Sequence, residues 1–316
     1  MTVSPEELRE RLRGLLAFPV TPFTGDGGLD LSRFREHLRY TIGAGPHGLF
    51  VCGGTGEFYS LGVDEYRTLV RAAVEEAGGE LPVVAGVGYG TRLAMELARI
   101  AEDEGADGLL VMPPYLIKAE QEGLLRHYRA IAASTSLGLI PYQRDNAVFT
   151  PQTAIRLAEM PNVVGLKDGH GDVENLNRIG SAVGDRLLLM NGMPTAELSA
   201  RAFAGAGVHS YSSAVFNFLP EISWAFYEAL TGEDDARHDE LLGGFFEPFA
   251  RLRDQRLGYN VSLVKTGVKL MGKTAGPVRP PLVDPTPDHE AELQSIVDRG
   301  LSLVRRGGER VGSEAR

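Results

Sequence analysis

One lysine and one tyrosine close short apolar runs, at positions where their chemistry could be used. Lys167 follows Val-Val-Gly-Leu, and Tyr142 follows Gly-Leu-Ile-Pro. A lysine with little access to water is costly to keep charged, so its pKa falls and part of it exists as the free amine that attacks a carbonyl. A phenol beside that amine could move protons while a carbinolamine forms and loses water. The pair therefore predicts Schiff-base chemistry.

Both residues also have a plainer interpretation. Lys167 could simply end its strand and turn to solvent. Tyr142 could be a core tyrosine with a satisfied hydroxyl. Only the convergence of the two side chains in the fold favours the chemical interpretation over the structural one.

A glycine-rich stretch, CGGTGEF at 52–58, offers consecutive backbone N–H donors and a hydroxyl. Such a loop suits a carboxylate, and Gly54 and Thr55 are its candidate ligand-binding residues. The alternative is a tight turn between a strand and a helix, with Glu57 near the start of the helix.

The charged stretch DGHGD after Lys167 gathers Asp168, His170 and Asp172. It lacks further partners at the spacing of metal ligands, so we interpret it as a solvated loop and expect no metal. The stretch GVGYG at 86–90 has the spacing G-x-G-x-G, which is not the fingerprint of a dinucleotide site.

Eight apolar runs rich in Val, Leu and Gly have to position these residues, and helix-period segments separate them. Each run is continuous and does not alternate with polar residues, as is typical of strands buried on both faces of a parallel sheet. Eight such units favour an α/β fold, a (β/α)8 TIM barrel, over a doubly wound sheet. The runs are 14–23, 48–54, 82–88, 108–114, 138–143, 163–169, 186–192 and 207–213.

From residue 216 onward the pattern is helical, apart from a Pro-rich irregular link at 273–287. We expect the first of these helices to close the barrel. The predicted division is a barrel with the catalytic site at 1–231 and a C-terminal helical extension packed on it at 232–316.

In such a barrel the active site lies at the carboxyl ends of the strands. Besides the residues already named, the predicted strands bring two kinds of side chain there. Aromatic, amide and hydroxyl groups could contact a substrate, and a further glycine could admit one. The additional candidates for substrate binding are Tyr115, Asn191, Gly192, Ser212 and Ser213.

The composition limits the partners. The formal net charge is -10, and no cluster of Lys and Arg forms the dense cationic patch that nucleic acids or anionic membranes need. No apolar run approaches the roughly 20 residues of a membrane span. The single cysteine, Cys52, and the charged N-terminal segment predict a cytoplasmic protein. A small-molecule partner remains, because a pocket needs only a few local donors.

Several motifs in this order resemble the dihydrodipicolinate synthase / N-acetylneuraminate lyase superfamily, and within it most closely the family of 5-dehydro-4-deoxyglucarate dehydratases. The resemblance implies Lys167 as the Schiff-base lysine, Tyr142 as the proton-relay tyrosine, and Thr55 with Gly54 as the carboxylate-binding element. The motifs are FPVTPF, CGGTGEFYSL, VGYGT, GADGLLVMPPYL, YQRDNAVF, VGLKDGHGD, NGMPTAE, YSSAVFNFLPE and AGPVRPPL, between about residues 14 and 285.

The resemblance also implies an activity: dehydration and decarboxylation of 5-dehydro-4-deoxyglucarate to 2,5-dioxopentanoate, in the breakdown of glucarate and galactarate. It implies neither a metal nor an organic cofactor, and a homo-oligomer, either a tetramer or a dimer. Another class I lyase of the superfamily, an aldolase or a synthase, is the nearest alternative. Leu116, where the synthases usually have a second tyrosine after the position of Tyr115, and the segment YQRDNA count against this alternative. Gln143 stands where the synthases, and usually the dehydratases too, have an asparagine.

Two alternatives come from other classes. A non-catalytic barrel that binds sugar acids would keep the carboxylate loop but would not need both Lys167 and Tyr142. An enzyme acting on sugar phosphates would carry a glycine-rich phosphate grip after the last two strands, where this chain has NGMPTAE and YSSAV.

Overall fold

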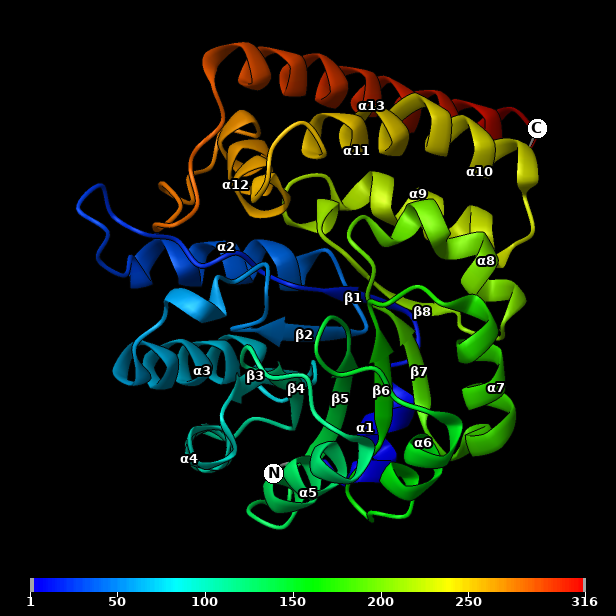
Figure 1. Cartoon of the computed structure of the whole chain (residues 1–316). Helices are drawn as coiled ribbons and strands as arrows, with labels where there is room; N and C mark the ends of the chain where they lie inside the picture. The colour runs from blue at the N-terminus through cyan, green and yellow to red at the C-terminus, as the bar shows by residue number, and fades with distance from the viewer. Residues whose placement is uncertain (1–2, 315–316) are drawn as a thin grey trace.

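The computed structural model describes residues 3–314, with side chains described for residues 3–306. Eight parallel strands close into a barrel in chain order, with β8 beside β1 (Figure 1). The predicted (β/α)8 barrel is therefore confirmed. The strands are β1 Leu15–Ala17, β2 Gly48–Val51, β3 Val83–Tyr89, β4 Gly108–Pro114, β5 Gly138–Gln143, β6 Gly165–Asp168, β7 Leu188–Asn191 and β8 Ser210–Ser213.

Helices follow the strands and cover the outside of the barrel. Short polar side chains cap several of them, as when Asp172 accepts a hydrogen bond from the N–H of Asn175 at the start of α7. The helices are α1 Pro5–Arg11, α2 Leu31–Gly43, α3 Val63–Ala77, α4 Thr91–Asp103, α5 Gln121–Ala132, α6 Pro151–Ala158, α7 Val173–Val183, α8 Ala200–Gly205, α9 Pro220–Thr231, α10 Asp235–Leu241, α11 Glu247–Arg253, α12 Tyr259–Leu270 and α13 Pro287–Glu314.

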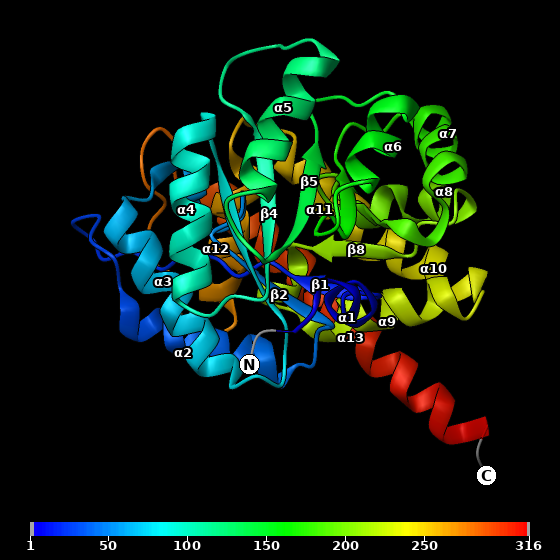
Figure 2. The ribbon, with the colours of Figure 1, turned by 90° about the horizontal axis from the view of Figure 1, so that it is seen from below.

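The barrel interior is a separate apolar cluster, filled by side chains from most of the strands. Helix α1, dark blue in Figure 2, contributes Leu8 and Leu12 to this cluster. Leu8 lies so close to Gly108 and Gly138, the first residues of β4 and β5, that a side chain at either glycine would meet it. Helix α1 therefore closes the amino-terminal end of the barrel and leaves the carboxyl end for a site.

The C-terminal helices pack together beside α9. Helix α13 contacts α9, α11 and α12, and it lies along α10 and α11 in Figure 1. A π-helical turn, Leu242–Phe246, joins α10 to α11. The segment 273–286 is irregular, as the Pro-rich link predicts. The division of the chain at residue 231 stays a prediction.

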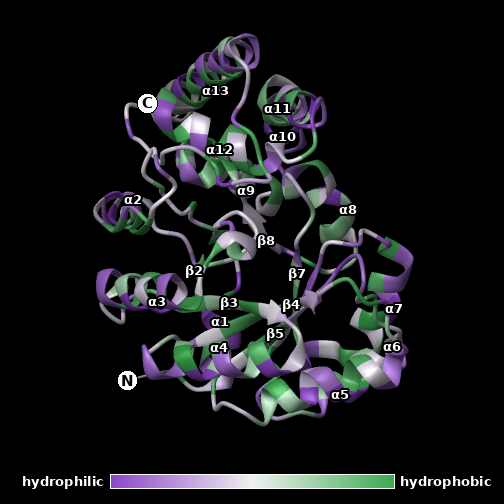
Figure 3. Cartoon of the chain, turned by 60° about the vertical axis from the view of Figure 1, so that its left-hand side comes forward, coloured by the Kyte–Doolittle hydropathy of each residue, from purple (hydrophilic) through white to green (hydrophobic). Residues whose placement is uncertain are grey.

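The hydropathy of the helices matches their place outside the barrel. In Figure 3 helices α2 and α3 carry both hydrophobic and hydrophilic residues, and their buried residues face the apolar core around the strands. Within residues 3–314, no helix combines the length and the apolar character needed to cross a membrane.

Candidate active site

Lys167 and Tyr142 are brought together by the pairing of β5 with β6. The register places Tyr142 opposite Lys167, so both side chains face the barrel interior. Lys167 is only 5% exposed and Tyr142 only 6%. The Lys167 Nζ lies 3.8 Å from the ring centre of Phe18 and 4.7 Å from that of Tyr142. The lysine therefore does not turn to solvent, and the two predicted catalytic residues lie side by side.

The electrostatic environment favours the neutral amine. Burial lowers the pKa of Lys167 to about 7, and the positive charge of Arg144 acts in the same direction. Among the described residues, no carboxylate forms an ion pair with Lys167 that would oppose this shift. A large fraction of the lysine is therefore free amine near neutral pH, which is the nucleophilic form.

Tyr142 is held by two hydrogen bonds at the mouth of the barrel. Its hydroxyl donates to the carbonyl of Gly192 at 2.7 Å and accepts from Nη1 of Arg144 at 3.4 Å. Burial raises the pKa of Tyr142, while Arg144 acts in the opposite direction. The phenol therefore stays protonated near neutral pH and can donate a proton to a reacting group.

Gly192 provides the space in which Lys167 lies. A Cβ at this position would come within 2.5 Å of Cε of Lys167 and 2.9 Å of Cε2 of Tyr142. Any larger residue would have to displace the lysine. Gly192 is therefore needed for close packing against Lys167, whether or not it touches a substrate.

The glycine-rich loop faces the same cavity through Gly54 and Thr55. In the described part of the chain, neither backbone N–H of these two residues donates a hydrogen bond to another residue. Free N–H donors and a hydroxyl beside the lysine suit a carboxylate next to the carbonyl that the lysine attacks.

The side chain of Glu57 anchors this loop through a buried ion pair. Its Oε1 lies 2.6 Å from Nζ of Lys265 on α12, and both side chains are almost fully buried. Lys265 also donates to the carbonyl of Pro277 at 2.8 Å. Glu57 precedes a 3₁₀ turn, Phe58–Ser60, so its backbone forms a tight turn after the strand, as the alternative interpretation predicts. Its side chain, however, binds Lys265 on α12.

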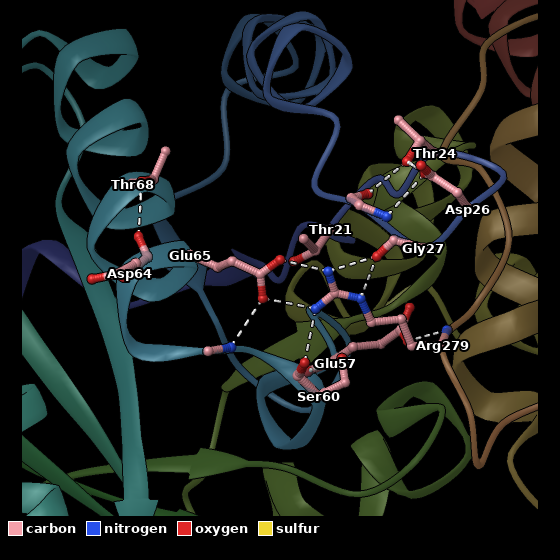
Figure 4. A network of polar contacts seen from close by, with 12 residues as sticks. Thr21, Thr24, Asp26, Gly27, Glu57, Ser60, Asp64, Glu65, Thr68 and Arg279 are labelled. Carbon is pink, nitrogen blue, oxygen red and sulfur yellow. Dashed lines mark hydrogen bonds and ion pairs between the residues drawn. The ribbon is translucent and has the colours of Figure 1, made fainter.

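Arg279, in the segment between α12 and α13, adds a second anchor (Figure 4). Its backbone N–H donates to Oε2 of Glu57 at 2.9 Å. Its guanidinium binds the carboxylate of Glu65 and the carbonyls of Ser60 and Gly27. Arg279 thus connects the loop at Glu57 with two other parts of the chain, Gly27 and the stretch from Ser60 to Glu65.

The cavity at the carboxyl end of the barrel has a volume of about 690 Å³, counting space open to solvent. Its lining includes three basic side chains and no Asp or Glu among the described residues. Arg144 and Arg253 are cations, and the third basic side chain is Lys167. Its chemistry therefore suits a small anion that carries a carbonyl group.

Comparison with known proteins agrees with this geometry. The model of the dihydrodipicolinate synthetase family matches residues 11–299. The chain belongs to this family. Among solved structures, dihydrodipicolinate synthase from Bacillus clausii has a TM-score of 0.86 at 27% identity, covering 92% of this chain and 98% of that chain.

Two relatives within the family are more similar in sequence. The probable 5-dehydro-4-deoxyglucarate dehydratase 1 of Streptomyces avermitilis is 53% identical over 97% of this chain and 100% of its own length. The probable 5-dehydro-4-deoxyglucarate dehydratase of Streptomyces griseus subsp. griseus is 54% identical over 96% of this chain and 97% of its own. The resemblance seen in the motifs is confirmed.

The remaining candidates of this family member divide into two groups. Ser212 lines the cavity, but Tyr115, Asn191 and Ser213 lie outside it. Asn191 is buried and binds the carbonyl of Ala196. Ser213 is buried on the opposite side of its strand from Ser212 and donates to a carboxylate, that of Glu197, at 2.6 Å. Tyr115 is 64% exposed beyond the end of β4.

Asp168 shapes the turn after β6. It is buried, and its Oδ1 accepts from the N–H groups of His170 and Gly171 at 3.1 and 2.8 Å. Its Oδ2 accepts from the amide of Gln143. Burial raises the pKa of Asp168.

Across the described residues, no group of three or more His, Cys, Asp or Glu side chains is placed to hold a metal ion.

Two arginines that line the cavity are not among the predicted site residues. Arg144 directly follows β5, a position that could have marked it. Arg253 is the last residue of α11, in the C-terminal helices, and no local pattern connects it with the barrel. Phe249 and Asn260 reach the cavity from the same region.

Proposed function

We propose that this chain dehydrates and decarboxylates 5-dehydro-4-deoxyglucarate to 2,5-dioxopentanoate, CO2 and water through a Schiff base on Lys167. The observation that carries the proposal is a buried lysine with a lowered pKa beside Tyr142, in a cavity lined by cations. The naming of relatives that match nearly the whole chain supports the same reaction.

The keto acid end of the substrate is assigned to the inner part of the cavity. The carboxylate beside the ketone binds the free N–H groups of Gly54 and Thr55, which directs the carbonyl carbon toward Lys167. The amine attacks this carbon, and Tyr142 supplies and removes protons as the carbinolamine loses water to form the imine.

The protonated imine then acts as an electron sink. Loss of a proton from the neighbouring methylene gives an enamine, which expels the hydroxyl group one carbon further on, and water leaves. The resulting conjugated iminium accepts the electron pair of the bond to the distal carboxylate, which leaves as CO2. Protonation, tautomerisation of the enol to the aldehyde, and hydrolysis of the imine release the product and restore Lys167.

Three further features belong to this proposal. The C-terminal helices at 232–316 form an extension packed on the barrel at 1–231, supported by the side chains that they place in the cavity. The enzyme assembles as a homo-oligomer, supported by an exposed apolar run, Tyr115 to Ile117. It acts in the cytoplasm, as expected from its single, buried cysteine.

The proposal is tested with the full chain and 5-dehydro-4-deoxyglucarate. We expect CO2 and 2,5-dioxopentanoate in equal amounts, and borohydride should trap the substrate on Lys167, as mass analysis of peptides would show. Lys167→Ala should lower turnover by at least about 10⁴-fold, because it removes the nucleophile. Lys269→Ala, at an exposed lysine of α12, is the control and should leave turnover unchanged.

Two results would contradict the proposal. Turnover of the diacid without any adduct on Lys167 would exclude the Schiff base. An adduct on Lys167 with release of pyruvate and no CO2 would instead identify an aldolase of the same family.

A further inference from the structure

Arg253 lies in the cavity although it belongs to a helix outside the barrel. It ends α11, and its side chain is only 13% exposed. We propose that Arg253 is the specificity residue that binds the distal carboxylate of the substrate, the one that leaves as CO2. This inference rests on the proposed function and adds the group that recognises the far end of the diacid.

Among the described residues, not every N–H donor of the Arg253 guanidinium has an acceptor. Of its five N–H groups, Nε and one on Nη2 face Oδ1 of Asp254, each at 2.8 Å. One on Nη1 donates to Oγ1 of Thr195 at 2.5 Å. Within the described residues, one donor remains on each terminal nitrogen. These two donors can bind the oxygens of a carboxylate.

The two arginines of the cavity serve different ends of it. Nη1 of Arg144 donates to the hydroxyl of Tyr142, which lies beside Lys167, whereas Nη1 of Arg253 donates to Oγ1 of Thr195, in the loop after β7. Burial raises the pKa of Glu197, in the 3₁₀ turn Ala196–Ser199, and the charge of Arg253 acts in the opposite direction. The proposed function places the keto acid end at Lys167 and the glycine-rich loop. Arg253 is therefore the cation that remains for the distal carboxylate.

The carboxylates that hold the arginines do not compete with a substrate. Asp145 pairs with Arg144 and Asp254 with Arg253, and these two aspartates are 67% and 66% exposed. Each aspartate holds its arginine from the solvent side. The charge that faces the cavity is therefore positive, and a dianion is favoured over a monoanion.

The chemistry of decarboxylation determines which kinetic constant should change. An ion pair with the distal carboxylate exists in the bound substrate but not after CO2, a neutral molecule, has formed. Arg253 therefore contributes to binding and to the choice of substrate, and its loss should raise KM far more than it lowers kcat. A substrate with an uncharged end would leave two N–H donors of the largely buried guanidinium without an acceptor and is rejected for that reason.

The test compares Arg253→Gln and Arg253→Lys with Arg251→Gln, a control on the same helix whose side chain is 77% exposed. For Arg253→Gln we expect KM for 5-dehydro-4-deoxyglucarate to rise by about 10- to 100-fold, the range of a charged hydrogen-bonded pair. Arg253→Lys should recover part of the loss, and Arg251→Gln should behave as the wild type.

Two further probes separate a binding role from a structural one. Pyruvate has no far end, so borohydride should trap it on Lys167 equally well in the wild type and in Arg253→Gln. The 2-keto-3-deoxy acid with a terminal hydroxymethyl group should bind poorly to the wild type, and the preference for the diacid over it should fall at least tenfold in the variant.

Each outcome decides the inference. An unchanged KM and an unchanged preference in Arg253→Gln would overturn it, and so would an equal loss of pyruvate trapping, which would show a structural role. If Arg253→Gln does not fold, Arg253→Met replaces it, and a preference equal to that of the wild type together with an unchanged KM would overturn the inference. Failure of the wild type to trap pyruvate on Lys167 would instead contradict the proposed function.

Discussion

Two lysines of this molecule show that burial alone does not make a nucleophile. Lys167 and Lys265 are 5% and 3% exposed. Burial lowers the pKa of both, but the carboxylate of Glu57 opposes the shift at Lys265 only. Lys265 is therefore kept as a structural cation, while Lys167, with Arg144 nearby, becomes a free amine near neutral pH.

The first prediction concerns the pH dependence of imine formation. The free amine reacts, so the rate should rise with pH through about 7, the pKa of Lys167, and then level off. Arg144→Gln removes a positive charge that disfavours protonation, so the pKa should rise and the midpoint should move to higher pH. At pH 7 the rate would fall by about fivefold if the pKa rises by one unit from about 7.

Borohydride trapping of pyruvate at a series of pH values measures this midpoint. Arg156→Gln, at an arginine that pairs with Glu122 on the outside of the barrel, is the control and should leave it in place. A midpoint that stays or moves to lower pH in Arg144→Gln would refute this account of the lysine.

At the scale of elements, the C-terminal helices hold the loops of the barrel mouth. The loop after β2 binds α12 through the pair of Glu57 with Lys265, and it binds the segment after α12 through Arg279. Helix α11 adds Arg253 to the cavity. Loops are thereby fixed by helices, which is how a site keeps its reacting groups in position.

The second prediction tests the buried pair of Glu57 and Lys265. Lys265→Met should lower the free energy of unfolding by roughly 3–5 kcal/mol, because it leaves a carboxylate buried without its cation. The double variant Glu57→Gln/Lys265→Met should recover most of this loss, since the amide oxygen of the new glutamine can still accept the backbone hydrogen bond of Arg279. Urea unfolding of the single and double variants measures both effects.

Lys269→Met, on the same helix, provides the matched control. Lys269 is 63% exposed and pairs with Glu290 at 2.7 Å, so its replacement should cost no more than about 1 kcal/mol. A double variant as unstable as Lys265→Met would show that the charge of Glu57 is not the cause.

At the scale of the whole molecule, overall charge and local charge differ in sign. The chain carries a net charge of -10, yet its cavity is lined by cations and, among the described residues, by no carboxylate. A dianionic substrate is therefore attracted by a few oriented groups at short range and not by the field of the whole surface.

The third prediction concerns assembly. Tyr115, Leu116 and Ile117 form an apolar run that is 62–72% exposed beside the mouth of the barrel. Burying it between copies would remove apolar surface from water. We expect light scattering to give a mass that is a multiple of 34.1 kDa, and Leu116→Glu to lower that mass.

Leu257→Glu is the control, because Leu257 is fully exposed in the turn between α11 and α12 and should not affect the mass. A wild type of 34.1 kDa would exclude the oligomer. An oligomer that survives Leu116→Glu would place the interface on another surface.

The sequence by itself determined the barrel and pointed to Lys167 and Tyr142 as its candidate pair. Strands buried on both faces need continuous apolar runs. Seven of the eight predicted runs contain a whole strand of the barrel, and the run at 82–88 misses only Tyr89, the last residue of β3. The run at 14–23 contains the shortest, Leu15–Ala17, because Pro19 and Pro22 cannot donate to a strand ladder. Lys167 and Tyr142 were recognisable because each ends such a run.

The tertiary structure decided which neighbours of that pair share its cavity. Ser212 faces the cavity and Ser213 faces away, a difference of one residue that a continuous apolar pattern does not reveal. Arg253 reaches the cavity because α11 packs over the end of the barrel, and Lys265 meets Glu57 because α12 packs there too. Such contacts join segments far apart in the chain, and only the packing of the helices brings them together.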